Sequence, residues 1–317
     1  MKLRKILLSV VSAMIAVTAM ADKNLSIGTG GTGGVYYALG GGLAKILTDK
    51  LPDTQVTAEV TGASIDNLKF IRAGKMDIGF TMADSASDAV QGVEKFKDNK
   101  VAVRTIAALY PNHVHVVTTA NTGINTLSDL KGKRLSTGAP GSGTEVVALR
   151  MLEALGFDKD KDVTRDRLSV NESVDALKDG KIDAFIWAGG LPTAAVTDLA
   201  TTPGTKIKLL DHAEVADVMN KKYGQLYTKG SIPAKVYPGQ DKAVSNVQVW
   251  NLLVVDAKMS EDLAYQITKT LFDGLPDLVR VHQEASNISL KHQGSASPIP
   301  YHPGAKKYFK EKGITVQ

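Results

Sequence analysis

The chain contains one order of predicted elements twice, and this internal repeat constrains the fold more than any other feature of the sequence. In each copy, a short strand leads into a glycine-rich run, a helix, a strand, an amphipathic helix and a further strand. The segments of the first copy are 25–27, 28–34, 36–49, 55–60, 64–73 and 77–82, and those of the second are 134–137, 138–144, 145–155, 166–170, 172–178 and 182–187. Strands that alternate with helices predict an α/β fold with a mostly parallel sheet.

The two copies also agree in single residues. The segment 64–69 (SIDNLK) is followed by 74–77 (GKMD), and the similar segment 173–178 (SVDALK) is followed by 180–183 (GKID). Two such units in one chain of 317 residues predict two lobes, with a single larger Rossmann-type sheet as the alternative.

Two long apolar runs, 104–119 and 247–255, are expected to cross between these lobes, the first with a break at Tyr110-Pro111-Asn112. The predicted boundaries are 22–114 and 249–317 for lobe one, and 115–248 for an inserted lobe two. The expected fold class is therefore α/β, with two α/β lobes joined by two crossing strands.

The first 21 residues have the pattern of a secretory signal peptide. Lys2, Arg4 and Lys5 precede an apolar run (6–17), and Ala19-Met20-Ala21 has small residues at the positions of a cleavage site. A membrane anchor is the alternative, but this run is shorter than the roughly 20 residues that cross a bilayer. We expect secretion, with cleavage after Ala21.

Charge and cysteine content narrow the function classes. The leader holds three of the 38 Lys and Arg residues, so the mature chain has 35 basic and 33 acidic residues, a formal net charge of +2. A nearly neutral chain with scattered lysines offers no basic surface for nucleic acid. The absence of cysteine excludes disulfides, thiol catalysis, cysteine-ligated metals and a lipid-modified cysteine after the leader. Because an untethered secreted receptor needs an outer barrier to retain it, we expect a periplasmic location.

The first glycine-rich run, 28–34, formally matches the dinucleotide motif G-x-G-x-x-G between a strand and a helix. That motif needs an acidic residue at the end of the next strand, but this strand ends at Thr61-Gly62. No P-loop lysine follows either glycine-rich run. A nucleotide is therefore not expected, and no other cofactor is predicted.

The same runs can bind an anion without a cofactor. Glycine lets a ligand approach the backbone, and the helix that follows directs unpaired N–H groups and a partial positive charge at the turn. Two equivalent runs facing one cleft would suit a ligand with two acidic groups, while tight turns without a ligand are the alternative. The predicted ligand-binding residues of these runs are Gly33, Gly34, Val35, Tyr36, Ser142, Gly143 and Thr144.

Further candidates lie near predicted helix starts and strand ends. Ser64 follows Thr61-Gly62-Ala63 and is expected first as a helix N-cap and second as a ligand donor. Asp84, Trp187 and Gly189 lie at equivalent strand ends of the two lobes, where open α/β sheets bind ligands. A helix cap is the alternative for Asp84, and a core position is the alternative for Trp187.

No catalytic pattern accompanies these candidates. His113 and His115 alternate on a strand without a carboxylate cluster, and no nucleophile elbow or S-x-x-K element stands at a suitable place. We expect neither an enzyme nor a metal site, with a secreted enzyme on the same fold as a remaining alternative.

Five short segments follow one another along the mature chain: 28–37 (GTGGTGGVYY), 61–68 (TGASIDNL), 109–111 (LYP), 138–144 (GAPGSGT) and 301–305 (YHPGA). In this order they resemble the TAXI solute receptors of tripartite ATP-independent periplasmic (TRAP) transporters. The resemblance implies a type II periplasmic-binding fold, a sodium-driven membrane permease as partner, and a small organic anion as ligand. Glutamate, glutamine and 2-oxoglutarate are ligands of this kind. It implicates the opening loop through Tyr36, the Ser64 region, Tyr110 and the loop 142–144 in ligand binding.

We expect a monomer whose lobes close around the ligand, so that water is excluded and polar contacts strengthen. A receptor for an ABC transporter on the same fold is the main alternative. Met82 and Asn112 depart from the family pattern, in which a polar Gln and an acid are expected, so the choice of ligand stays open.

Overall fold

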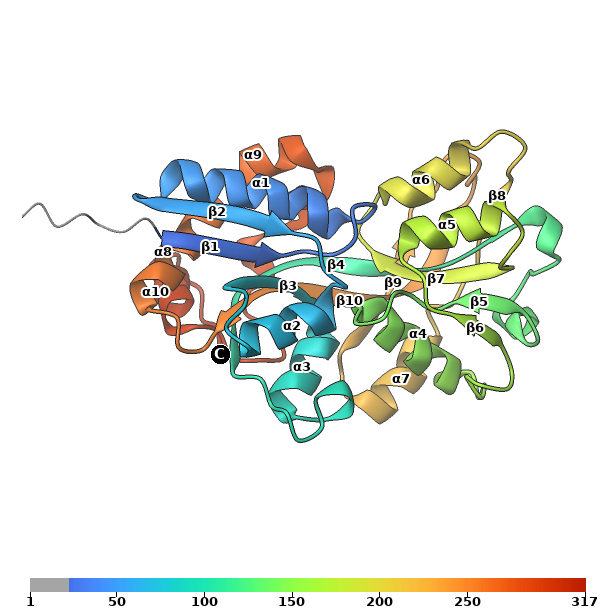
Figure 1. Cartoon of the computed structure of the whole chain (residues 1–317), viewed down its shortest axis with the longest axis horizontal. Helices are drawn as coiled ribbons and strands as arrows, with labels where there is room; N and C mark the ends of the chain where they lie inside the picture. Colours follow the sequence, from blue (N-terminus) through green and yellow to red (C-terminus); the bar gives the residue numbers. More distant parts are fainter. Residues whose placement is uncertain (1–22) are drawn as a thin grey trace, which may run out of the picture.

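The computed structural model describes residues 23–317, so the predicted signal peptide (1–21) lies outside the described residues. The described chain forms an α/β structure with two lobes side by side, as the internal repeat predicts (Figure 1). The blue N-terminal and orange-red C-terminal segments share one lobe, and the green and yellow middle of the chain forms the other.

The bounds of the elements follow the two predicted copies closely. Lobe one contains β1 (Lys23–Gly28), α1 (Val35–Lys50), β2 (Thr54–Glu59), α2 (Ser64–Arg72), β3 (Ile78–Met82), α3 (Ala83–Gln91), α8 (Glu261–Asp273), α9 (Leu275–Val281) and α10 (Pro303–Glu311). Lobe two contains β5 (Arg134–Ser136), α4 (Gly143–Ala154), β6 (Thr164–Asp166), α5 (Val170–Lys178), β7 (Ala184–Gly189), α6 (Ala194–Thr201), β8 (Ile207–Leu209), α7 (Val215–Tyr223) and β9 (Tyr227–Ile232). Within residues 23–317, no helix has the length and apolar character that a bilayer crossing requires.

Across residues 23–317, the strands form one mixed sheet of ten, with the main order β2-β1-β3-β10-β4-β7-β5-β6. The pairs among the repeated strands are parallel: β1 pairs with β2 and β3, and β5 pairs with β6 and β7. The pairs that β3, β7, β8 and β9 form with β4 or β10 are antiparallel. The two parallel sets repeat the same arrangement, because each begins with the strand that precedes a glycine-rich loop.

Two long strands, β4 (Val103–Thr119) and β10 (Val244–Asp256), pass from one lobe to the other (Figure 1). β4 pairs with β10 over residues 103–113 and with β7 over residues 113–118. β10 pairs with β9 over residues 244–249 and with β3 over residues 251–255. The two predicted crossing strands are therefore confirmed, while the boundaries of the lobes stay a prediction.

β4 runs through Pro111 without the interruption that the sequence suggests. Proline lacks an N–H group, so a sheet tolerates it mainly where the pairing is irregular. Pro111 lies opposite Trp250, and the register between β4 and β10 shifts between Trp250 and Leu252. The proline thus falls beside a bulge, and the strand continues into lobe two.

The strand predicted over residues 166–170 is wrong. β6 ends at Asp166, and Val170 is already the first residue of α5. The Ser169 hydroxyl accepts a hydrogen bond from the Glu172 N–H, and the Glu172 carboxylate accepts one from the Ser169 N–H. This capping box starts the helix earlier than the apolar spacing indicates.

The core of lobe one fixes the direction of α1. Leu39, Leu43 and Leu47 recur on one face of this helix, and each is at most 2% exposed. They pack in one apolar cluster with Ile27 of β1 and Ile78 of β3. Burial of a leucine contributes roughly 2 kcal/mol. This packing holds the N-terminus of α1 at the carboxyl end of β1, beside lobe two.

Candidate functional site

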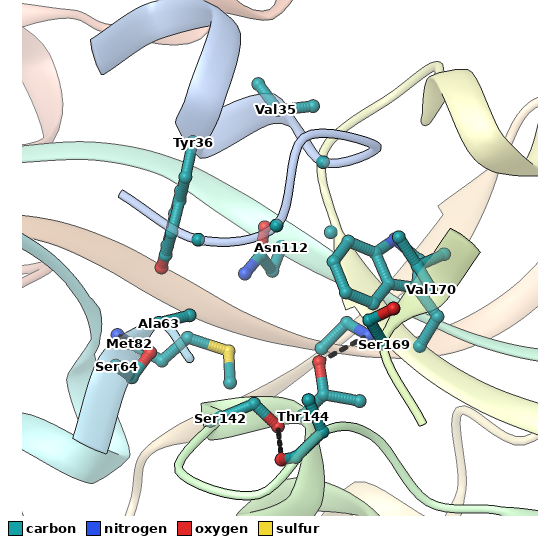
Figure 2. A pocket seen from close by; sticks show the side chains of 18 of the residues that line it. Val35, Tyr36, Ala63, Ser64, Met82, Asn112, Ser142, Thr144, Ser169 and Val170 are labelled. Atoms are coloured by element: carbon teal, nitrogen blue, oxygen red, sulfur yellow. Dashed lines mark hydrogen bonds between the residues drawn. The ribbon is translucent and has the colours of Figure 1, made fainter. Parts of the chain in front are cut away.

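A cavity with a volume of about 80 Å³ lies between the two lobes, beside the crossing strand β4. This space is several times what one water molecule needs, so it fits a small solute. Figure 2 shows how Tyr36, Ser64 and Met82 from lobe one and Ser142 and Thr144 from lobe two surround it.

The structure brings most of the predicted site residues together at this cavity. Those that line it are Gly34, Val35, Tyr36, Ser64, Tyr110, Ser142, Gly143, Thr144, Trp187 and Gly189. Gly33 and Asp84 do not line it. That the lining residues bind a ligand stays a prediction.

Sequence reasoning missed about half of the lining. The additional residues are Gly30, Gly31, Thr61, Gly62, Ala63, Met82, Asn112, Ala139, Ser169, Val170, Ala188 and Gly190. Most are direct neighbours of predicted residues. Ser169 and Val170 come from an unpredicted helix start, and the pattern S-x-x-E at 169–172 was the signal that could have found it.

Within the described part of the chain, four helices begin at the cavity: α1, α2, α4 and α5. The N-cap residues of all four line it, namely Gly34, Ala63, Ser142 and Ser169. The first turn of a helix carries N–H groups without intrahelical partners and a partial positive charge. The sequence predicted three of these starts, two at the glycine-rich loops and one at Ser64, and the fold adds the start of α5.

The start of α1 depends on glycine for close approach to lobe two. Gly34 has an extended backbone and caps α1 without a side chain, and its N–H donates to the Gly31 carbonyl at 3.1 Å. A Cβ atom at Gly34 would lie 3.2 Å from the Trp187 ring. The Trp187 indole N–H donates to the Thr193 hydroxyl at 2.9 Å, so this ring presents an apolar wall to the cavity.

The hydroxyl groups of Ser142 and Thr144, at the start of α4, form hydrogen bonds with other groups of the protein. The Ser142 hydroxyl accepts from the Glu145 N–H at 3.0 Å and donates to the Ala139 carbonyl at 2.7 Å. The Thr144 hydroxyl accepts from the Ala188 N–H at 3.3 Å. Ser142 therefore caps α4, while the binding of a ligand by Ser142, Gly143 and Thr144, which all line the cavity, stays a prediction.

The start of α2 contacts the other lobe. The N–H groups of Ile65 and Asp66 both donate to the carbonyl of Gly141 in lobe two, at 3.1 and 3.2 Å. Ser64 is the first residue of α2, and its hydroxyl accepts from the Met82 N–H at 3.1 Å. The expectation that Ser64 is the N-cap is wrong, because Ala63 takes that position with a φ of +85°.

Tyr110 and Asn112 of β4 line the cavity, and each carries one buried polar atom without a hydrogen-bond partner in the described chain. Both side chains are buried, at 0% and 3% exposure. Among the described residues, neither the Tyr110 hydroxyl nor Asn112 Oδ1 has a hydrogen-bond partner. Beside them, the Tyr36 hydroxyl donates to Asn251 Oδ1. Burial raises the pKa of both tyrosines, so their phenols stay protonated, and the Tyr110 hydroxyl keeps a proton that no partner within residues 23–317 accepts.

Asp84 lies outside the cavity in a buried ion cluster between the lobes. Its Oδ2 accepts from the Tyr227 hydroxyl at 2.8 Å and lies 3.6 Å from Arg150 Nη1. Arg150 also contacts Asp88 at 2.6 Å, and burial, opposed by Arg150, raises the pKa of Asp88 to about 6. Two carboxylates share one guanidinium here, so Asp84 joins the lobes, and it lies in the first turn of α3, whose N-cap is Met82.

Gly33 also lies beside the cavity and not in its lining. Its carbonyl accepts from the Ala195 N–H of lobe two at 3.4 Å. A Cβ atom at Gly33 would lie 2.0 Å from the Asn171 side chain, so glycine lets the loop pack against lobe two.

Charged side chains do not contribute to the cavity. Among residues 23–317, the lining contains no Asp, Glu, Lys, Arg or His. The same described residues contain no cluster of three or more His, Asp or Glu that could hold a metal ion. The polar groups of the lining are therefore main-chain groups, hydroxyls and one amide.

The sequence profile of the NMT1-like family matches residues 27–313. The periplasmic aliphatic sulphonate binding protein SsuA from Escherichia coli has a similar structure, with 16% identity, a TM-score of 0.52, and coverage of 83% of this chain and 75% of that one. A putative L-cystine ABC transporter protein from Listeria monocytogenes matches with 18% identity and a TM-score of 0.50, over 83% and 95% of the two chains. The ligand-binding component of an ABC-type import system from Staphylococcus aureus matches with 13% identity and a TM-score of 0.51, over 92% of each chain. At these identities the likeness shows the fold, which is that of periplasmic solute-binding proteins.

Proposed function

The chain belongs to the NMT1-like family, and from this premise we propose that it is a periplasmic solute-binding receptor, which encloses one small organic anion between its lobes and delivers it to a membrane transporter. The observation that carries the proposal is the convergence of helix starts from both lobes on one cavity, whose lining includes two residues that each carry an unpartnered buried polar atom. A carboxylate in this space would accept hydrogen bonds from first-turn N–H groups and from the Tyr110 hydroxyl.

Lobe closure is part of the proposed mechanism. The Gly141 carbonyl of lobe two accepts from α2 of lobe one, and Asn171 Nδ2 donates to the Thr32 hydroxyl at 3.3 Å. These contacts belong to a closed arrangement, and a solute can enter only when they open. A ligand that contacts both lobes favours closure, because it binds the closed form better than the open one.

The transporter that we propose is a TRAP permease driven by a sodium gradient, on the strength of the five ordered segments that resemble TAXI receptors. An ABC transporter is the second candidate, because the similar structures from Listeria and Staphylococcus carry ABC transporters in their names. Uptake into vesicles that contain this receptor and the permease encoded beside its gene separates the two. Loss of uptake on collapse of the sodium gradient supports the first candidate, and dependence on ATP supports the second.

Binding without turnover is the proposed activity, and the periplasm is the proposed location. The polar groups of the cavity are partnered hydroxyls, neutral phenols and an amide, and none of the lining side chains within residues 23–317 is a general base at neutral pH. We propose a monomer, since the cavity is formed from the two lobes of one chain.

A melting screen with small organic acids tests the proposed function, because a solute that binds only the folded protein raises its melting temperature. Tyr36→Ala removes a ring and a hydroxyl from the cavity, and we expect affinity for a stabilising acid to fall at least about tenfold in calorimetry. Tyr37→Ala is the matched control, because Tyr37 is 41% exposed and does not line the cavity. Equal affinity in Tyr36→Ala and wild type would count against this site.

A further inference from the structure

We infer that the ligand is an organic acid without an ammonium group, and that Asn112 is the residue that sets this preference. The inference rests on the proposed function and narrows it: among the expected solutes it favours diacids and oxo acids over amino acids. Four features carry it, namely the neutral lining, the position of the nearest carboxylates, the uncharged amide of Asn112 in the lining and the cost of burying an unpaired ammonium.

A neutral lining gives an ammonium group no counter-ion. The cavity wall, as far as residues 23–317 form it, has no carboxylate. The helix starts add partial positive charge, which attracts an acid and repels a cation. An ammonium in this space would have only carbonyl, hydroxyl and amide oxygens as acceptors.

The carboxylates nearest the cavity are turned to other partners. Asp84 Oδ1 accepts from the Ser85 N–H at 2.7 Å, and its Oδ2 accepts from Tyr227. Behind the cavity wall at Gly190, Glu284 is 2% exposed. Its Oε2 accepts from the Leu191 N–H at 2.6 Å, and its Oε1 accepts from Asn287 at 2.8 Å.

Asp66 is the third acid near the site, and it lies behind the glycines of the two loops. Cβ atoms added at Gly62 and at Gly141 would lie 2.4 and 2.3 Å from its carboxylate oxygens. The backbone of both loops therefore separates Asp66 from the cavity, whose lining does not include it. Asp66 is half-buried, and its carboxylate belongs to the surface outside the cavity lining.

Asn112 holds the position from which a side chain can contact the polar end of a ligand directly. It lies on the crossing strand β4, and Figure 2 shows it behind the space that Tyr36 and Thr144 border. Its Oδ1 is buried without a partner among residues 23–317. The amide N–H groups of Asn112 can donate to a carboxylate, whereas the uncharged side chain cannot neutralise an ammonium.

The preference for an acid over the matching amino acid follows from the free energy that removal of an ammonium group from water costs. An ammonium that leaves water without reaching a carboxylate loses its hydration without compensation, and an unpaired buried charge is strongly unfavourable. The matching acid without the amino group avoids this loss and keeps the same carboxylate contacts. We therefore expect two ligands that differ only in the amino group to differ clearly in affinity, and the ligand without the amino group to bind more tightly.

The experiment compares glutarate with glutamate and succinate with aspartate in calorimetry on the mature protein. We expect the better member of each pair to be the acid without the amino group, by at least about tenfold in dissociation constant. Equal or tighter binding of the amino acid overturns the inference and leaves the proposed function intact. If none of these acids, 2-oxoglutarate included, raises the melting temperature, the proposed function falls as well.

Asn112→Asp tests the assignment of this residue. A carboxylate at this position should weaken glutarate binding at least about tenfold and reduce the preference for glutarate over glutamate. Asn246→Asp is the matched control: Asn246 is also fully buried with an unpartnered Oδ1, but it contacts His113 and does not line the cavity. An unchanged preference in Asn112→Asp, or the same change in both variants, would contradict the role of Asn112.

Discussion

Ser142 shows how one residue can serve the fold where its sequence context points to a ligand. The serine after Gly-Ala-Pro-Gly lies at the cavity, as expected, but its hydroxyl is bonded to Glu145 and Ala139. The local sequence places the residue correctly because a glycine-rich turn before a helix has few conformations. It does not reveal the direction of the hydroxyl, because capping and ligand binding use the same donor and acceptor groups.

Replacement of Ser142 separates the two roles. Ser142→Ala removes the N-cap of α4 and should lower the free energy of unfolding by about 1 kcal/mol, whereas Ser142→Gly should cost only a few tenths. Urea denaturation of both variants measures this difference. If the hydroxyl served only the ligand, both variants would unfold at the wild-type urea concentration.

At the scale of elements, Gly141 connects the loop before α4 with the start of α2. Its φ of +79° is a left-handed conformation that suits glycine, and its carbonyl accepts the N–H groups of Ile65 and Asp66. A Cβ atom here would lie 2.3 Å from the Asp66 carboxylate. The contact joins the lobes, so a side chain at this position should oppose closure.

Gly141→Ala is therefore expected to weaken binding of glutarate at least about fivefold in calorimetry, because closure contributes to affinity. Gly132→Ala is its control, since Gly132 has a φ of +75° but no atom within 4 Å of an added Cβ. Both variants place an alanine at a left-handed φ of similar size. The difference in their affinities for glutarate therefore reports the contact with Asp66. Equal affinities in the two variants would show that the Gly141 contact does not act in closure.

Elements with a regular apolar pattern could be predicted from sequence, and elements set by a single polar group could not. The spacing of Leu39, Leu43 and Leu47 places α1 within one residue of its observed bounds. The start of α5 was missed because Ser169 and Glu172, and not apolar spacing, define it. The path of β4 through Pro111 depends on a bulge in β4 itself, where its pairing with the distant strand β10 shifts, and no local pattern encodes this shift.

At the scale of the whole molecule, the internal repeat explains why one cavity receives helix starts from both lobes. Each copy places its glycine-rich loop at the carboxyl end of an equivalent strand, β1 or β5, and the crossing strands turn these ends toward each other (Figure 1). The sequence could predict the two loops because the repeat is visible in it. The neutral lining and the bonds between lobes arise from contacts between distant segments, which the sequence does not display.

Amide chemical shifts measured on the ¹⁵N-labelled protein give the most direct test of the claim that main-chain N–H groups at the starts of α1 and α4 bind the carboxylate of the ligand. The ligand is whichever of glutarate, succinate and 2-oxoglutarate raises the melting temperature most. We predict the largest shift changes at the amides of residues 35–37 and 143–145, at the starts of α1 and α4. Changes confined to residues outside the cavity, with both of these segments unmoved at saturation, would contradict the account.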